Sequence, residues 1–403
     1  MFDLIIIGAG ALGTFHAYHA AKAGLRVLLL EKDRYPVGAT VRNFGQVVPS
    51  GLAGRWFDYG RRSLDIYRAI QRETDLTVRQ NGTIYIASDA DEWTLANELH
   101  DRYARIGYPS ELFGKAHCLA KYPALQPDYV VGGLFFPDEL SVEPEQMIHR
   151  LIAFVQRKYG VDYRPGSTVI DVQANGSGAI VTLSNQQRFQ AGRVLICSGH
   201  EVRLLFPDVL ADANLVVSKL QMLLAEPVDG LVLTGNILTG LTIRRYEAFQ
   251  ECPSYASIAA KLPDHLAELK KWGIHILFKQ ATDGSIIVGD SHEYADATRA
   301  EDLGYHTQDF INDLMLTEAR RIVTFPLTIR KTWAGFYSQT TAEIFEHDVD
   351  PAIRIVTGIG GKGMSSGAGY AEDSVRQWLG VDFGQDLLPH FSYSKENNMP
   401  FSK

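Results

Sequence analysis

The chain has few cysteines, a deficit of basic residues and no long apolar run. Its three cysteines, Cys118, Cys197 and Cys252, stand far apart and form no CxxC pair. This spacing excludes a disulfide framework and a cysteine-based zinc site, and we expect no metal site. Lys and Arg number 39 against 47 Asp and Glu, a formal net charge of −8 without the concentrated basic surface that nucleic-acid binding needs.

No apolar run approaches the length of a membrane span, and the N-terminus lacks the basic region of a signal peptide. We therefore expect a cytoplasmic protein. With 403 residues the chain is too long for one ordinary core, so it should fold as two lobes. Because the net charge is negative, any anionic ligand must be met by local positive groups.

The N-terminal region has the pattern of a dinucleotide-binding unit. Asp3 to Ile7 is typical of a buried parallel strand, and a helical pattern runs from Thr14 to Ala23. Between them a GxGxxG turn provides, in order, the tight turn, the close approach to a pyrophosphate and the close packing of the helix: Gly8, Gly10 and Gly13. We expect Ala11 and Leu12, at the start of the helix, to face the phosphates.

A second strand is predicted from Leu25 to Leu30, and it ends at Glu31 and Lys32. A carboxylate at this place accepts hydrogen bonds from both ribose hydroxyls of an adenosine and disfavours a 2′-phosphate. A glycine turn alone would also fit a loop without a ligand. The strand, the helix and the acid together indicate a nucleotide, and they leave NAD and FAD open.

Four blocks of the sequence resemble the D-amino-acid oxidase family, which includes glycine oxidase and sarcosine oxidase. They are the glycine turn through Glu31, GATVRNFGQVVPSG from Gly38, AGRVLICSGH from Ala191 to His200, and RIVTGIGGKGMSSGAGYAEDSVRQWLG from Arg354 to Gly380. The resemblance implies FAD and an α/β fold, with a Rossmann-like FAD-binding lobe of the glutathione-reductase type and an interleaved α+β substrate lobe. The FAD lobe would take residues 1–80, 142–215 and 325–385, the substrate lobe 81–141 and 216–324, and a tail 386–403.

The resemblance also implies which residues touch FAD. Val169 would reach the adenine, and Gly199 would lie in a turn against the cofactor. The second block would lie beside the isoalloxazine ring, and the fourth would close over the flavin pyrimidine. The residues implied in these two blocks are Arg42, Asn43, Phe44 and Gly45, and Gly360, Gly361, Lys362, Gly363 and Met364.

The glycine loop of the fourth block has a physical logic of its own. A reduced flavin carries negative charge near N1 and C2=O. Backbone N–H groups of the glycines, the positive end of the following helix and the Lys362 ammonium can all stabilise that charge. The alternative is that the glycines only allow tight packing.

The substrate lobe shows four strand patterns and a hairpin turn at Asp283-Gly284. The strands are expected at Leu220–Ala225, Leu238–Tyr246, His275–Gln280 and Ser285–Val288. Alternation along the second strand would send Arg244 and Arg245 to opposite faces, so that one could hold an anionic substrate. Tyr246 would line the same cavity, and Arg330 would supply a second anion clamp. The alternatives are a solvated arginine pair and a structural salt bridge.

Within the family the sequence is similar to a branch of bacterial oxidoreductases associated with phosphonate breakdown. The similarity lies in GATVRNFG, Leu205-Phe206-Pro207, Lys219 to Met222 and GGKGM. It implies oxidation of a primary or N-methylated aminoalkylphosphonate by hydride transfer to flavin N5, giving an imine that hydrolyses to an aldehyde. The alternatives are a glycine-, sarcosine- or D-amino-acid-type oxidase and a non-catalytic FAD-binding subunit.

Ile287 stands where some relatives carry a lysine that assists oxygen. Oxygen and another electron acceptor therefore both remain open, as does the oligomeric state.

Some relatives attach their flavin to a cysteine just before a Tyr-Thr pair, but the similar stretch here, Thr332 to Glu343, has no cysteine. The FAD should therefore be non-covalent. We predict that the purified protein is yellow and that acid precipitation leaves the flavin in the supernatant, as an absorbance spectrum of both fractions would show. Yellow colour that stays in the pellet would contradict this prediction.

Overall fold

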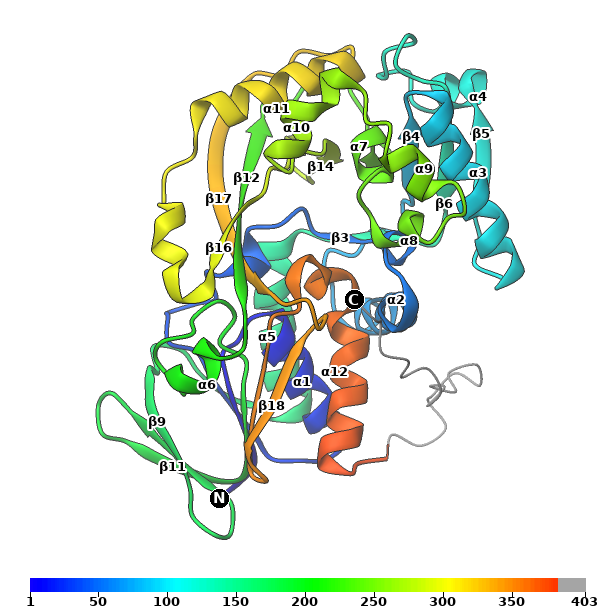
Figure 1. The fold of residues 1–403 in the computed structure, drawn as a ribbon. Coiled ribbons are helices and arrows are strands. Elements are labelled where there is room, and N and C mark those ends of the chain that lie inside the picture. Colours follow the sequence, from blue (N-terminus) through cyan, green and yellow to red (C-terminus); the bar gives the residue numbers. More distant parts are fainter. Residues whose placement is uncertain (383–403) are drawn as a thin grey trace.

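The computed structural model describes residues 1–382, and the predicted tail lies outside them. Two large sheets form the frame of the molecule (Figure 1). The lower part of this view holds the N-terminal sheet, and the upper part holds the second sheet with its helices. No helix within residues 1–382 is long and apolar enough to cross a membrane.

The first sheet contains the predicted dinucleotide-binding unit. At its centre, β1 (Phe2–Ile7) runs parallel to β11 (Arg188–Ile196) on one side and to β2 (Val27–Leu30) on the other. The predicted first strand, its helix and the second strand are thus confirmed, the helix being α1 (Ala11–Lys22). The remaining described strands of this sheet are β19 (Ile353–Thr357), β18 (Phe345–Asp350), β8 (Asp162–Arg164), β10 (Ala179–Leu183) and β9 (Val169–Ala174).

Both faces of the first sheet are covered, which explains why β1 is apolar and buried from Leu4 to Ile7. Leu4 and Ile6 pack into a core with four helices, namely α1, α2 (Gly54–Gln71), α5 (Pro144–Tyr159) and α12 (Gly363–Leu379). Ile5 and Ile7 pack on the opposite face, against residues of β9 and β10. The carboxyl ends of the parallel strands are left for a ligand, as in other open α/β sheets.

The second sheet is mixed, and its long strand β12 (Val216–Ala225) pairs along its length with β17 (Ile329–Gln339). β17 therefore belongs to this sheet, although it falls in the range expected for the FAD lobe. The predicted hairpin at Asp283-Gly284 joins two antiparallel strands of it. The other described strands are β16 (Glu293–Asp296), β15 (Ile286–Gly289), β14 (Leu277–Gln280), β13 (Asn236–Leu238), β4 (Thr83–Ala87), β6 (Gly132–Phe136) and β5 (Glu111–Gly114).

The two faces of the second sheet have different partners. One face packs under α11 (Asp309–Ile322), with Val288 among its buried residues. The other carries Leu220, Met222 and Ile287 and meets Phe44 of the first lobe. This second face is the roof over the carboxyl ends of the first sheet.

The predicted strand from Leu238 to Tyr246 is wrong beyond Leu238. Thr239 remains extended, but Gly240–Ile243 form the short helix α7. The buried carboxylate of Glu92 lies so close that a Cβ at Gly240 would come 2.2 Å from its Oε2. Glu92 Oε1 also accepts from Arg244 Nε at 2.7 Å, and the Gly240 N–H donates to the Tyr129 hydroxyl at 3.3 Å. Tertiary contacts at both ends of α7 thus hold a segment whose Leu-Thr-Ile run favours a strand.

Shorter elements complete the described chain. The helices are α3 (Ala90–Arg105), α4 (Lys115–Lys121), α6 (Pro207–Ala211), α8 (Glu247–Gln250), α9 (Tyr255–Ala259) and α10 (Ala267–Lys271). The 3-10 turns are η1 (Ala39–Val41), η2 (Pro49–Gly51), η3 (Asp264–Leu266), η4 (Ala297–Leu303) and η5 (Gly360–Lys362). A two-stranded ribbon, β3 (Gln46–Val47) with β7 (Leu140–Ser141), links the lobes.

A buried ion-pair network ties β14 to the start of α5. Glu143 Oε1 accepts from Arg79 Nη2 at 2.6 Å, and its Oε2 lies 3.5 Å from Lys279 Nζ. Lys279 is almost wholly buried and also donates to the Val142 carbonyl at 2.6 Å. Burial lowers the pKa of Lys279 to about 8, against the opposing effect of Glu143.

Glu143→Gln should lower the free energy of unfolding by about 3–5 kcal/mol, because two cations lose their buried anion. The loss should be smaller above pH 8, where Lys279 can shed its proton. Urea unfolding at both pH values measures this. Glu343→Gln, which breaks an exposed pair with Arg55, is the matched control and should cost less than about 1 kcal/mol. Equal effects of the two variants would contradict the assignment.

Candidate cofactor and active site

The glycine turn after β1 has no room for side chains. Gly8 has φ +102°, and a Cβ there would lie 2.3 Å from the Cys197 carbonyl oxygen. A Cβ at Gly13 would lie 2.0 Å from the Gly8 carbonyl oxygen. The turn thus brings bare backbone to the carboxyl end of β1, as the sequence predicts.

Glu31 is buried and braces this turn. Its Oε2 accepts from the Ala9 N–H at 2.9 Å, and its Oε1 accepts from the Asp33 N–H at 3.1 Å. Each carboxylate oxygen keeps a further lone pair for a ligand hydroxyl. The chain leading to Val169 runs beside it, since the Ser167 N–H donates to the Glu31 carbonyl at 2.7 Å. Lys32 is exposed and pairs with Asp33 at 2.7 Å.

The loop after Gly38 closes over the start of α1. The Thr40 hydroxyl accepts from the Ala11 N–H at 2.9 Å, a contact that the sequence analysis missed although Thr40 lies in the GATVRN block. Asn43 uses its amide within the loop, donating to the Ala39 and Thr40 carbonyls and accepting from the Gly45 N–H. Asn43 therefore shapes the turn and has no free donor.

The same loop is anchored to the second sheet and leaves one amide unused. Arg42 Nη1 donates to the Ala334 carbonyl at 3.2 Å, and Trp333 Nε1 donates to the Arg42 carbonyl at 3.1 Å. Gln46 is buried, yet its Nε2 has no hydrogen-bond partner within the described residues. A buried orphan donor is costly unless a ligand acceptor meets it.

The glycine loop η5 lies near the side chains of two other elements. A Cβ at Gly361 would lie 3.7 Å from the Tyr337 hydroxyl, and Gly360 has φ +66°. Lys362 Nζ lies 3.0 Å from Glu247 Oε1 and 5.5 Å from the centroid of the Trp56 ring. The charge of Lys362 is therefore shared with Glu247 on α8.

Two further residues of the predicted set are fixed by the surrounding strands. The Gly199 carbonyl accepts from the Ser338 hydroxyl at 2.9 Å and from the Thr357 hydroxyl, which ties its turn to β17 and β19. Met364 is buried at the start of α12, and its carbonyl accepts from the Tyr67 hydroxyl at 3.3 Å.

The structure separates the two predicted arginines, although not by strand alternation. Arg244 ends α7, and its guanidinium donates to Glu92 at 2.7 Å and to Asp89 at 2.5 Å. Two carboxylates neutralise its single charge. Arg245 instead donates to the Gly273 carbonyl at 3.3 Å and to the Tyr294 hydroxyl at 3.0 Å, both uncharged groups.

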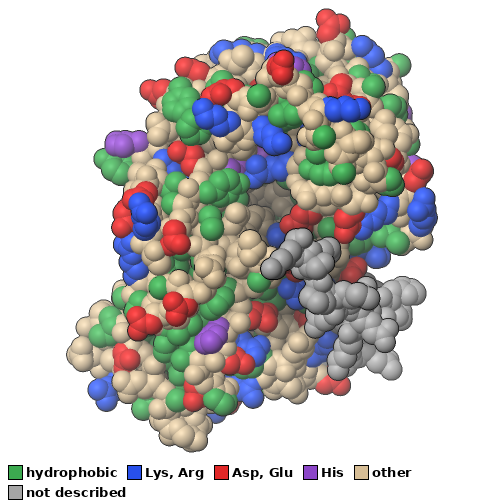
Figure 2. Space-filling view, viewed as in Figure 1, with side chains coloured by type: hydrophobic (Ala, Val, Ile, Leu, Met, Phe, Trp, Pro, Cys, Tyr) green, Lys and Arg blue, Asp and Glu red, His purple; other side chains and the backbone are tan. Residues whose placement is uncertain are grey.

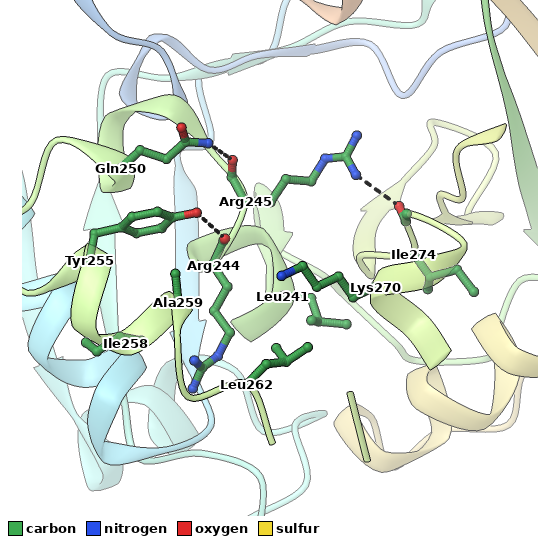
Figure 3. Close-up of a pocket in the computed structure, with 11 residues that line it drawn as sticks. Leu241, Arg244, Arg245, Gln250, Tyr255, Ile258, Ala259, Leu262, Lys270 and Ile274 are labelled. Atoms are coloured by element: carbon green, nitrogen blue, oxygen red, sulfur yellow. Dashed lines mark hydrogen bonds between the residues drawn. The ribbon is translucent and has the colours of Figure 1, made fainter. Parts of the chain in front are cut away.

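Arg245 borders a cavity of about 290 Å³ (Figure 3). Lys270, from α10, and Arg244 line the same cavity, and Tyr255 donates to the Arg244 carbonyl at 2.8 Å. The face in Figure 2 is hollowed near its middle, with Lys and Arg side chains at the upper rim of the hollow. Positive groups therefore gather locally on a chain of negative net charge.

Arg330 does not reach a cavity, and the prediction of an inward clamp is wrong. Its side chain is exposed, and its Nη2 lies 3.1 Å from Asp283 with Glu226 at 3.9 Å from Nη1. This is the structural salt bridge that stood as the alternative. Tyr246 packs against Gly51, where a Cβ would lie 2.3 Å from its ring, and its ring centroid lies 5.7 Å from that of His275.

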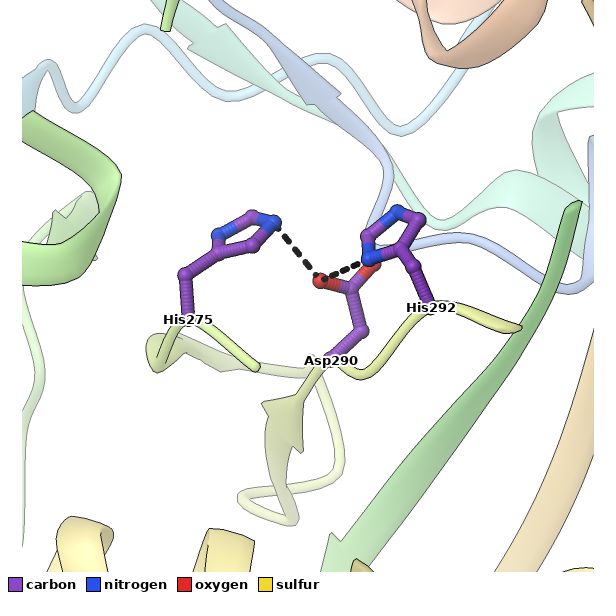
Figure 4. A group of neighbouring side chains, drawn as sticks. All are labelled: His275, Asp290 and His292. Carbon is purple, nitrogen blue, oxygen red and sulfur yellow. Dashed lines mark ion pairs between the residues drawn. The ribbon is translucent and has the colours of Figure 1, made fainter. Parts of the chain in front are cut away.

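A buried cluster that the sequence analysis missed lies beside Arg245: His275, Asp290 and His292 (Figure 4). His275 lies just before β14 and Asp290 just after β15. The two residues exchange two backbone hydrogen bonds, which sets their side chains opposite each other. His275 Nε2 lies 3.0 Å from Asp290 Oδ1. The only sequence signal is the position of these polar residues at the two ends of a hairpin.

His292 has a defined tautomer. Its Nδ1 lies 3.1 Å from the Gly273 carbonyl, an oxygen that can only accept, so Nδ1 carries the proton. The same nitrogen lies 3.9 Å from Asp290 Oδ1. Nε2 therefore holds the lone pair, and Figure 4 shows it turned away from Asp290.

The cluster holds one negative charge. Burial alone would raise the pKa of Asp290, but His292, His275 and Arg245 together lower it below its ordinary value. Burial lowers the pKa of His292 to about 3 and that of His275 below its usual range, while Asp290 opposes both shifts. At neutral pH the arrangement is a carboxylate between two neutral imidazoles.

The ligand-type atoms of the three side chains all lie within 4.8 Å of one another, so the cluster has the composition of a possible metal site. Arg245 adds a positive charge to the same space, which disfavours a cation there.

Comparison with known proteins identifies the family. The family model described as FAD dependent oxidoreductase matches residues 3–376. The chain belongs to this family. It is an FAD-dependent oxidoreductase, as the resemblance in the sequence implies.

Three relatives illustrate the spread of the family. A glycerol 3-phosphate dehydrogenase of Caloramator mitchellensis is 24% identical over 91% of this chain and 71% of its own length. Dimethylglycine dehydrogenase of Rattus norvegicus is 29% identical over 50% of this chain, but the match spans only 24% of that protein. The crystal structure of glycine oxidase from Geobacillus kaustophilus has a TM-score of 0.75 at 16% identity, with 96% of this chain and 97% of that one covered. The last comparison confirms the α/β fold with mixed sheets.

Glu31→Ala should weaken FAD binding more than it slows the FAD-loaded enzyme, because the carboxylate lies at the nucleotide end of the first sheet. Losing a charged hydrogen-bond pair costs roughly 1.5–3 kcal/mol, or about ten- to more than hundredfold in affinity. Flavin fluorescence titration of the apoprotein measures the affinity. The exposed variant Lys32→Ala is the control, and an FAD affinity equal to that of the unchanged protein in Glu31→Ala would contradict the role.

Proposed function

We propose that this oxidoreductase binds FAD non-covalently and oxidises a small primary or N-methylated amine that bears an anionic group, with an aminoalkylphosphonate as the first candidate. The observation that carries the proposal is the juxtaposition of Arg245, whose hydrogen-bond partners within residues 1–382 are uncharged groups, with the buried carboxylate of Asp290. The arrangement is complementary to a substrate with an anion at one end and an ammonium at the other.

The predicted FAD residues fit the described geometry. Gly8 and Gly13 leave no room for a Cβ against the surrounding backbone, Gly10 would let the pyrophosphate approach, and Glu31 has lone pairs for the ribose. The buried Gln46 amide supplies an unused donor, and the η5 backbone at Gly361 supplies others. The remaining residues that we assign to this site are Ala11, Leu12, Lys32, Arg42, Asn43, Phe44, Gly45, Val169, Gly199, Gly360, Lys362, Gly363 and Met364.

The chemistry follows from these placements. FAD supplies the hydride acceptor, N5, and the protein binds the amine, orients its α-carbon and excludes water. Tyr246 and Tyr337 would wall the space between the glycine loop and the histidine cluster. The imine product then hydrolyses to an aldehyde or keto acid.

Two observations bear on the substrate. Glycine and dimethylglycine, after which two of the relatives are named, are amines with a carboxylate, and glycerol 3-phosphate carries a phosphate. A phosphonate offers three oxygens and up to two charges, which suits the Arg245 guanidinium together with the Lys270 ammonium in one cavity. The alternative is an amino carboxylate, which needs only one bidentate partner.

Ile287 is buried and lies among apolar side chains of the roof, so no ammonium stands at the position where some relatives use lysine with oxygen. Oxygen and another acceptor both stay possible. The three cysteines are free and buried, which suits the reducing cytoplasm that we propose as its location.

Anaerobic flavin bleaching tests the proposal directly. Aminophosphonates, amino acids and neutral amines are added to the yellow protein without oxygen, and loss of flavin absorbance identifies the substrate class. Readmission of oxygen then separates an oxidase from a dehydrogenase. Bleaching by no amine at all would overturn the proposed function and favour a non-catalytic FAD-binding subunit.

Arg245→Met should lower kcat/KM for anionic amines, with a loss of about 2–4 kcal/mol of transition-state stabilisation. The substrate anion loses its charged partner, while the side chain keeps most of its length. A neutral amine of similar size should not lose activity. Arg330→Met is the matched control and should behave as the unchanged enzyme, since its exposed guanidinium pairs only with Asp283 and Glu226. Equal kcat/KM values of the two variants with anionic amines would contradict the assignment of Arg245 as the anion clamp.

A further inference from the structure

The His275, Asp290 and His292 cluster lies next to Arg245, a residue of the cavity lining, although its own three side chains do not line that cavity. Arg245 Nη1 and His292 Nδ1 both contact the carbonyl oxygen of Gly273, at 3.3 and 3.1 Å. On the other side, the His292 ring centroid lies 6.3 Å from that of Tyr337, whose hydroxyl lies next to Gly361. His292 thus lies between the arginine and the loop proposed to cover the flavin.

We propose that His292 Nε2 takes a proton from the ammonium group of the bound substrate, and that Asp290 and His275 are positioning residues that hold and polarise it. This inference rests on the proposed function and deepens it, because it assigns the step that makes the amine oxidisable. The tautomer fixed by the Gly273 carbonyl leaves Nε2 as the acceptor.

The chemistry requires such an acceptor. An ammonium has no lone pair, so the C=N bond cannot form while the α-carbon loses its hydride. In the proposed step the substrate N–H bond breaks, the Nε2–H bond of His292 forms, and the nitrogen keeps its electron pair. That pair is then available for the C=N bond when a hydride, with its two electrons, leaves the α-carbon, and bound FAD would supply the acceptor for this hydride.

The charges around His292 favour this transfer when the substrate is bound. Asp290 stabilises an imidazolium, whereas Arg245 opposes it. A substrate anion beside Arg245 offsets the opposing charge and so raises the proton affinity of His292. His275 also faces His292 within the cluster, and the phenols of Tyr246, Tyr294 and Tyr337 lie beside the two imidazole rings.

His275 and Asp290 act through His292 and not on the substrate. The His275 ring stacks on the His292 ring at 5.5 Å and 13°, and its Nδ1 lies 3.4 Å from the Thr242 hydroxyl of α7. Asp290 is held opposite His275 by the paired backbone hydrogen bonds. Asp290→Asn keeps this shape and removes the charge that stabilises the imidazolium.

The test is the pH dependence of flavin reduction. In the unchanged holoenzyme, the acid limb of kcat/KM and of the anaerobic reduction rate should lie below the solution pKa of the substrate amine, since the enzyme deprotonates the bound ammonium. In His292→Gln the limb should move up to that solution pKa. The rate at pH 7 should fall by roughly 10²- to 10⁴-fold and recover as the pH rises.

The variants separate a proton acceptor from a structural residue. Asp290→Asn should move the limb in the same direction by a smaller amount, while His149→Gln, on the exposed side of α5, should leave it unchanged. Flavin content and circular dichroism report folding. A His292→Gln limb identical to that of the unchanged enzyme, with activity lowered equally at every pH, would overturn the inference.

If His292→Gln fails to fold, the pH dependence of the unchanged enzyme still tests the inference. An acid limb that coincides with the solution pKa of each of several amines would mean that only free neutral amine reacts, and it would overturn the inference. Bleaching by amines in such an experiment would leave the proposed function standing. If no amine bleaches the flavin, the proposed function itself is overturned, and the inference about His292 falls with it.

Discussion

The negative charge of Asp290 is the constraint around which the active-site side of the molecule is arranged. A carboxylate buried at this depth is stable only with positive charge or donors around it. The structure supplies His275 at 3.0 Å, His292 at 3.9 Å and the nearby guanidinium of Arg245. These neighbours come from the α7–α8 segment and the two ends of the β14–β15 hairpin, so stabilising one carboxylate brings separate segments of the chain together.

This arrangement requires a glycine at position 273. Its φ is +58°, and a Cβ would lie 2.8 Å from the Cβ of His292. Only a residue without a side chain lets the carbonyl reach both Arg245 and His292. The carbonyl thus fixes the tautomer of the imidazole and the position of the guanidinium with one acceptor, so that the proposed anion site and the proposed base are not independent.

The sequence was informative where the signal is local. The turn from Gly8 to Gly13 and the acid at Glu31 could be predicted because strand, turn and helix follow one another within about thirty residues, and each step has its own pattern. The strand at Leu238–Tyr246 was mispredicted because the contacts that hold α7 come from Glu92 and Tyr129, more than 100 residues earlier. The histidine cluster was invisible for the same reason, since His275 and His292 meet only after the hairpin has formed.

The coupling between Arg245 and His292 also says what kind of selectivity this site can have. Without a bound anion, burial and the Arg245 guanidinium lower the pKa of His292 against the opposing effect of Asp290, so His292 is a weak base. On the proposed function, a neutral amine would therefore meet a poor proton acceptor, whereas an anionic amine would strengthen the proposed base as it binds. The substrate anion is then needed in the reaction and not only in binding, so selectivity for anionic amines should appear in the rate of reduction as well as in affinity.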